Sequence, residues 1–145
     1  MASSVYNRGK KMLGNGDTIW GTQVIGVILV ASGYTPDVDH NFVSDLTAEL
    51  SGGNYVRKVL ASKAVTENDT DDRFEYAATA VTWTALEAAA GSPTKAIIYD
   101  NTNGSDATRD LIAWIELQSP PVPNGGDYVV QWDQSAGIQD LIRLT

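Results

Sequence analysis

Short runs of apolar or alternating residues follow one another along most of this sequence, separated by clusters of glycine, proline, asparagine and aspartate. Charged and aromatic side chains alternate in residues 73–77, and Tyr128, Val130 and Trp132 fall on one side of another run. This two-residue period is typical of half-buried strands. Many short strands joined by such turns favour a mainly β fold, which we expect to be a single-domain antiparallel β-sandwich or jelly roll.

The first expected strand, residues 22–30, is rich in valine and isoleucine and apolar on successive positions, as in a strand covered on both faces. One or two helical turns are expected, at 44–50 and 85–90. A short N-terminal helix is also expected, with Ser3 or Ser4 near its start and a glycine-containing turn at 14–16 to end it. The remaining expected strands are 55–60, 63–66, 73–78, 80–83, 95–100, 111–117, 128–132 and 138–144.

A chain of 145 residues is long enough to bury a real core, with roughly 70% of its unfolded surface removed from water. The chain has no cysteine, so stability must come from that core or from association. We expect a helical arm at 1–16 and a β-sandwich domain at 17–145, with Trp83, Trp114 and Val130 in one core.

The net charge of −8 opposes attraction to nucleic acid and to anionic membranes, so neither is expected as a partner. The N-terminal segment differs locally, because Arg8, Lys10 and Lys11 are three of only ten basic residues. Charge patterning offers two interpretations of this segment: a solvated helix face, or a basic arm that contacts a partner.

His40 is the only histidine, and no motif supplies a nucleophile for it to activate. With Asp37 and Asp39 it forms either a small metal or acid/base site or, as we favour, a turn in which a carboxylate pairs with His40. The acidic run 67–72 suits either calcium or an exposed turn, and the turn is favoured because the EF-hand glycine and glutamate are missing. We therefore expect no catalytic, cofactor-binding or metal-binding residue and no enzyme activity.

The four tryptophans are candidates for a sugar-stacking platform or for interface anchors. Core packing is the simpler explanation for three of them, which lie in or at the end of expected strands, whereas Trp20 lies between Gly16 and Gly21. The candidate partner-contact residues are Tyr6, Arg8, Lys10, Lys11, Met12 and Trp20.

Residues 27–46 run from an apolar strand through a turn into a second ordered segment. Together with 81–83, 96–100 and 128–132 in the same order, this stretch resembles a widespread group of small tailed-bacteriophage virion proteins, of the capsid decoration or cement type. The resemblance implies a structural protein on the capsid exterior that binds and stabilises the assembled major capsid protein lattice. It implies synthesis in the cytoplasm of the host bacterium, and a homo-oligomer, either trimer or dimer, is expected.

Other functions remain open from the residues. Similar small β-proteins serve as head fibres, neck proteins or tail components of phages. A carbohydrate-binding β-sandwich module is a second class, and burial of Trp83, Trp114 and Trp132 would count against it. A hydrolase is the third class, limited by the single histidine to carboxylate or metal chemistry.

Overall fold

The computed structural model describes residues 3–118, 120–135 and 138–144. It is mainly β, with antiparallel sheets, one α-helix (α1, Asn7–Asn15) and two single 3-10 turns (η1, Val43–Asp45, and η2, Ala88–Ala90). The predicted fold class is therefore confirmed. The strands are β1 Ser3–Val5, β2 Ile25–Val30, β3 Lys58–Val59, β4 Ala64–Asn68, β5 Arg73–Ala77, β6 Val81–Trp83, β7 Lys95–Asp100, β8 Leu111–Glu116, β9 Tyr128–Val130, β10 Asp133–Ser135 and β11 Ile138–Leu144.

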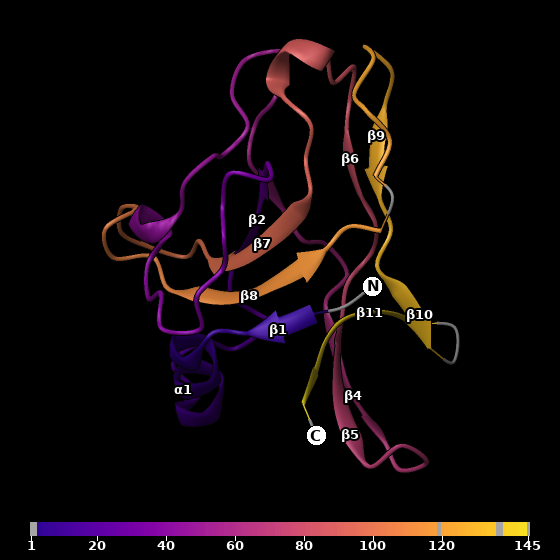
Figure 1. Cartoon of the computed structure of the whole chain (residues 1–145). Helices are drawn as coiled ribbons and strands as arrows, with labels where there is room; N and C mark the ends of the chain where they lie inside the picture. The colour runs from indigo at the N-terminus through magenta and orange to yellow at the C-terminus, as the bar shows by residue number, and fades with distance from the viewer. Residues whose placement is uncertain (1–2, 119, 136–137, 145) are drawn as a thin grey trace.

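A five-stranded sheet in the order β1-β8-β7-β2-β3 forms the centre of the molecule (Figure 1). Every residue of β2 is buried, as expected for a strand covered on both faces. Gly26 in this strand leaves room for the Tyr99 ring, because a Cβ at Gly26 would lie 2.4 Å from ring atoms. The sheet is thus closely packed at its centre.

Two hydrophobic cores lie on the two faces of this sheet. Val27 and Leu29 point into the larger core, which also contains Trp83, Val130 and Trp132. The alternate β2 residues, Ile28 and Val30, point into a smaller core with Tyr6, Tyr34 and Val43. Trp83 and Val130 share a core as predicted, but Trp114 does not join it, because its side chain packs on the opposite face with its ring centroid 4.7 Å from that of Tyr6.

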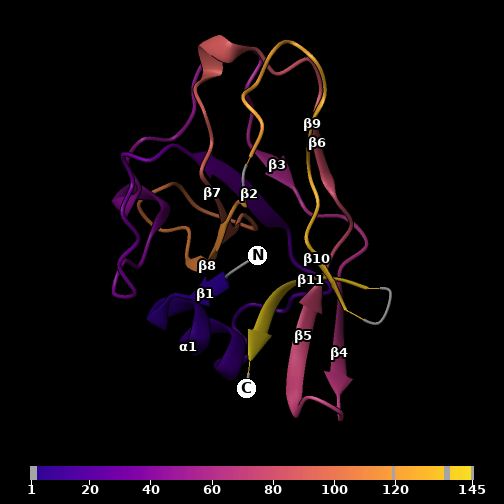
Figure 2. The ribbon, with the colours of Figure 1, turned by 45° about the vertical axis from the view of Figure 1, so that its right-hand side comes forward.

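Two smaller sheets complete the fold. β6 pairs with β9, and a four-stranded sheet has the order β10-β11-β5-β4. Figures 1 and 2 show the β4–β5 hairpin extending away from the central sheet, with β4 along the outer edge. We call this hairpin, residues 64–77, the projecting hairpin.

The N-terminal segment is part of the central sheet, contrary to the expected division at residue 16. Ser3, Ser4 and Val5 pair with β8, and Val5 and Tyr6 are buried, so a helix starting at Ser3 or Ser4 is wrong. Residues 1–2 of the expected arm lie outside the described residues. The predicted helix end is confirmed, because Gly16 has φ +76 and its N–H binds the Leu13 carbonyl.

Candidate functional site

Two of the six residues predicted to contact a partner are buried inside the molecule. The Tyr6 hydroxyl lies 2.8 Å from the Tyr34 hydroxyl, and burial, together with this hydrogen bond, raises the Tyr6 pKa. Trp20 is 2% exposed, and its Nε1 donates to the Ala77 carbonyl at 3.0 Å. The expectation that Tyr6 and Trp20 form a contact surface is wrong, because both serve the core.

The other four residues take different positions on α1. Arg8 Nε donates to Asp110 Oδ1 at 2.6 Å, and its guanidinium lies over the Phe42 ring. Lys10 and Lys11 are exposed, and Met12 is half-buried at the rim of a cavity. The structure therefore does not bring the six residues together, and only the two lysines are freely accessible charges.

The segment around His40 is a turn, as favoured from the sequence. Asp37 Oδ1 accepts the backbone N–H of Asp39, and the Asp37 carbonyl accepts that of His40. The His40 ring, however, binds no carboxylate in the part of the chain that the structure describes. Its Nδ1 lies 2.9 Å from the Tyr34 hydroxyl, which extends the Tyr6–Tyr34 pair into a chain of three side chains.

The acidic run 67–72 comprises the last two residues of β4 and the turn of the projecting hairpin. Asn68 Oδ1 accepts the backbone N–H groups of Thr70 and Asp71. These bonds fix a tight turn between β4 and β5 through an asparagine side chain. In the parts of the chain that the structure describes, no three histidine, cysteine or acidic side chains are grouped to hold a metal ion.

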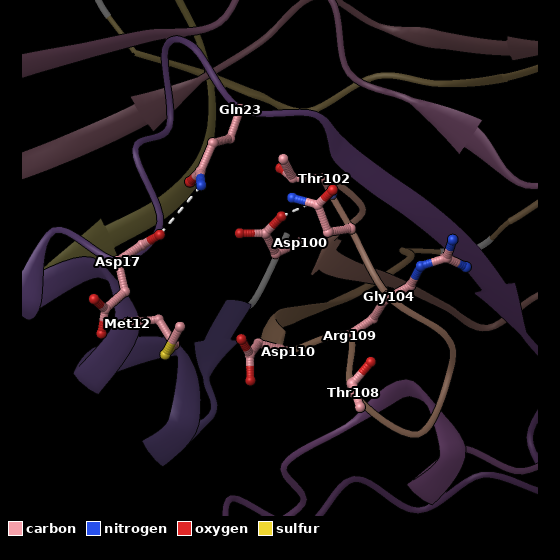
Figure 3. A pocket seen from close by; sticks show the side chains of 10 residues that line it. Met12, Asp17, Gln23, Asp100, Thr102, Gly104, Thr108, Arg109 and Asp110 are labelled. Carbon is pink, nitrogen blue, oxygen red and sulfur yellow. Dashed lines mark hydrogen bonds between the residues drawn. The ribbon is translucent and has the colours of Figure 1, made fainter.

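A cavity of about 250 Å³ lies between α1, the segment that joins α1 to β2, and the loop that joins β7 to β8 (Figure 3). The carboxylates of Asp17, Asp100 and Asp110 border it, whereas the Arg109 guanidinium extends away from them and lies 3.4 Å from Asp106 (Figure 3). This volume holds several water molecules or one small side chain. The excess of carboxylates makes the cavity attractive to positively charged groups.

The carboxylates of this cavity are already engaged by the fold. Asp100 accepts one bond from Thr18 Oγ1 at 2.8 Å and another from the backbone N–H of Thr102 at 2.9 Å. Asp110 is paired with Arg8. The cavity is lined by neither His40 nor a tyrosine, so it brings together no histidine-based acid/base pair. Its polar side chains connect α1 to β7 and β8.

A second polar cluster is centred on Arg57. Its guanidinium binds both oxygens of Glu49 at 2.7 Å and both oxygens of Asp106 at 2.7 and 2.9 Å. The hydrogen bond that Arg57 donates holds the pKa of Asp106 below its usual value, and the bonds that Arg57 donates to both carboxylates raise its own pKa. This one planar side chain joins Asp106, 49 residues away in sequence, to the segment that carries Glu49 and Arg57.

Asp106 gives a prediction about pH. Its folded pKa is depressed below the unfolded value of about 3.9, so the stability it contributes is fully present above that value and is lost as the pH falls through the folded pKa. Asp106→Asn should therefore lower the free energy of unfolding at neutral pH, by an amount that shrinks in acid. Urea unfolding of both proteins from neutral pH down to about pH 3 measures the difference. A difference that stays constant over this range would contradict the prediction.

The two faces of the projecting hairpin differ in chemistry. The cross-strand pairs Val65–Tyr76 and Glu67–Phe74 share one face, because paired residues lie on the same side of a sheet. At its inner end this face joins the larger core, where the Tyr76 ring packs edge-on against Trp20. On the same face Val65, directly opposite Tyr76, and Phe74, closer to the turn, are 48% and 51% exposed. The opposite face is polar, with Glu75 bound to Arg73 and Asn68.

We call Val65 and Phe74 the exposed apolar pair. Sequence reasoning missed them because residues 73–77 alternate as a half-buried strand does, and alternation does not tell whether the apolar side is covered. An apolar face that extends beyond the core that covers it is a common feature of interaction surfaces. The projecting hairpin is therefore the best candidate for a functional surface.

Comparisons with known proteins do not identify the chain. A scan against protein-family models, a search of curated proteins and a search of solved structures each found no match. Among the described residues, no helix combines the length and the apolar character needed to cross a membrane. The function is therefore inferred from the sequence resemblance and from the geometry above.

Proposed function

We propose that this chain is a structural protein of a phage particle, a decoration protein that binds the assembled major capsid protein lattice on the capsid exterior. The observation that carries the proposal is the exposed apolar pair on one face of the projecting hairpin. The resemblance of the sequence to decoration proteins implies that the partner is the major capsid protein. The projecting hairpin provides a surface that this partner can contact.

The expected binding energy is modest for each copy. Burying one valine or phenylalanine side chain completely is worth about 1.5–3 kcal/mol, and each side chain of the exposed apolar pair is already half covered. Together they contribute about 2 kcal/mol, which is in the range of an interface hot spot. A repeating lattice presents many equivalent sites, so decoration does not require very tight binding at each one.

The proposal describes a non-catalytic protein. His40 is engaged with Tyr34, and the cavity carboxylates Asp100 and Asp110 are bound to donors of the fold. These groups are explained by the hydrogen bonds that they make within the domain, so no substrate is needed to account for them. We therefore infer a binding role for the chain.

The carbohydrate-binding alternative finds less support. A sugar platform needs exposed aromatic faces. Trp20, Trp83 and Trp132 are 2%, 0% and 2% exposed, and each donates its indole N–H to a backbone carbonyl inside the fold. Trp114 is half-buried against Tyr6. The tryptophans thus act as core residues, which favours the capsid-binding proposal.

The exposed apolar pair gives the test of this proposal. A Val65→Ser, Phe74→Ser double variant should bind undecorated capsids roughly 30-fold more weakly than the parent chain, the ratio that corresponds to about 2 kcal/mol. Val122→Ser is the matched control, because Val122 is 65% exposed and lies outside the hairpin. Co-sedimentation with capsids over a range of protein concentrations measures both affinities.

Two results would contradict the proposal. If the parent chain does not sediment with the capsids, the capsid lattice is not its partner. If the double variant and the control bind as tightly as the parent chain, the exposed apolar pair is not the contact surface. Circular dichroism of each variant shows whether the fold is retained before binding is compared.

A further inference from the structure

We propose that β4 pairs with β4 of a second copy of this chain, antiparallel and around a two-fold axis at Thr66, so that the protein is a dimer in solution. The inference concerns the outer edge of β4 and does not depend on what the exposed apolar pair binds. In the dimer the two four-stranded sheets join into one continuous sheet.

The outer edge of β4 is open. β4 is the last strand in the order β10-β11-β5-β4, so within the described residues one side of its backbone has no neighbouring strand. Natural edge strands are usually protected by proline, lysine or a bulge. Residues 64–68 contain neither proline nor lysine, and β4 pairs with β5 in an unbroken register over all five residues. This edge is thus well formed for pairing with another strand.

Thr66, at the centre of β4, carries a buried hydroxyl that lacks a partner. Its Oγ1 is buried and makes no hydrogen bond with any described residue. Leaving such a group unpaired is costly, and because the Oγ1 is covered within one copy, a neighbouring strand reaches it only once the Thr66 side chain rotates toward the open edge. An axis at Thr66 places the two threonines directly opposite each other, and threonine pairs of this kind form hydrogen bonds across strands.

Charges at the two ends of β4 complement each other in the same register. Lys63 directly precedes the strand and Asp69 directly follows it, and neither makes an ion pair with another described residue. Within one copy they are separated by six residues of nearly extended chain, about 20 Å. An axis at Thr66 places Lys63 of each copy opposite Asp69 of the other, so the pair forms twice.

Neighbouring registers satisfy fewer groups. An axis at Glu67 would place two carboxylates directly opposite each other, which is destabilising. An axis at Val65 would place Lys63 opposite Glu67, but it would also put Thr66 opposite Ala64 and leave the hydroxyl unpaired. Only the axis at Thr66 pairs both the hydroxyl and the end charges.

Charge reversal with rescue tests the pairing. Sedimentation equilibrium of the full chain should show a monomer–dimer equilibrium, and Lys63→Glu should weaken dimerisation roughly tenfold by replacing two attractive pairs with two repulsive ones. Asp69→Lys should weaken it similarly. The double variant Lys63→Glu, Asp69→Lys should restore it, because the swapped charges meet across the axis. Lys11→Glu, on exposed α1, changes the net charge equally and should leave the dimer unaffected.

Three outcomes would overturn the inference. The parent chain could remain monomeric at every concentration. A dimer or trimer could form that Lys63→Glu does not weaken, which would place the interface elsewhere. Rescue of Lys63→Glu by Glu67→Lys rather than by Asp69→Lys would move the axis to Val65. Capsid binding by the Lys63→Glu variant is measured in parallel. This variant keeps the exposed apolar pair, so its capsid binding tests the proposed function independently of dimerisation.

Discussion

Gly9→Ala is expected to lower the free energy of unfolding by about 3 kcal/mol, although alanine is the better helix former. Gly9 is the buried residue of α1, and a Cβ added to it would lie 2.2 Å from the Ile112 carbonyl oxygen and 2.7 Å from the Ile112 Cα. These atoms belong to the backbone of β8 and cannot rotate away. The helix must therefore move off the sheet, which disturbs the nearby buried Tyr6.

Gly14→Ala is the matched control, because it makes the same change in the same helix where nothing lies within 4 Å of the added Cβ. It should stabilise the protein by about 0.5–1 kcal/mol, the intrinsic preference of a helix for alanine. Urea unfolding of both variants measures the contrast. Equal, small effects at the two positions would mean that α1 is not held against β8, and would restore the view of the segment as a separate arm.

Trp83→Ala is expected to cost about 3–5 kcal/mol of unfolding free energy, as for other buried aromatic side chains. Trp83 is 0% exposed in the larger core, and its Nε1 donates to the Val56 carbonyl at 2.7 Å. The substitution therefore leaves a large void and an unpaired carbonyl. For a domain whose total free energy of unfolding is about 5–15 kcal/mol, such a loss leaves many of the molecules unfolded at a moderate concentration of denaturant.

Val129→Thr is the control for this prediction. Val129 lies on β9, paired with the Thr82 that neighbours Trp83, but its side chain is 47% exposed. This β-branched replacement should change stability by less than about 0.5 kcal/mol. A comparable loss of unfolding free energy in both variants would show that the stability of the β6–β9 sheet depends on its surface rather than on the core. A loss below about 1 kcal/mol for Trp83→Ala would contradict the packing of Trp83 in the larger core.

The strands were predictable where one physical signal dominated. β2 was identified because six buried positions in succession need apolar side chains, and β5 because its charged and aromatic residues alternate. The conformation at the start of the N-terminal segment was predicted wrongly, and the reason is also physical. Val5 and Tyr6 fit a helical stripe with Met12 and Leu13, but pairing of β1 with β8 decides their conformation, and that partner lies more than a hundred residues away.

The polar clusters could not be predicted, because they join segments that are distant in sequence. Arg57 meets Asp106 only after β2, β7 and β8 have formed the central sheet, and the Tyr6–Tyr34–His40 chain joins the N-terminus to the turn after β2. The same limit applies to the exposed apolar pair. Alternation places Val65 and Phe74 on one face, but only the extension of the hairpin beyond the core leaves them uncovered.

The most direct test of the proposed function is electron cryo-microscopy of phage particles from the source of this chain. The account predicts density for the domain on the outside of the capsid, with Val65 and Phe74 of the projecting hairpin against the major capsid protein. Particles that lack the chain, or that carry it only at the neck or tail, would contradict capsid decoration. Contact through Lys10 and Lys11 of α1, with the hairpin facing solvent, would contradict the assigned surface.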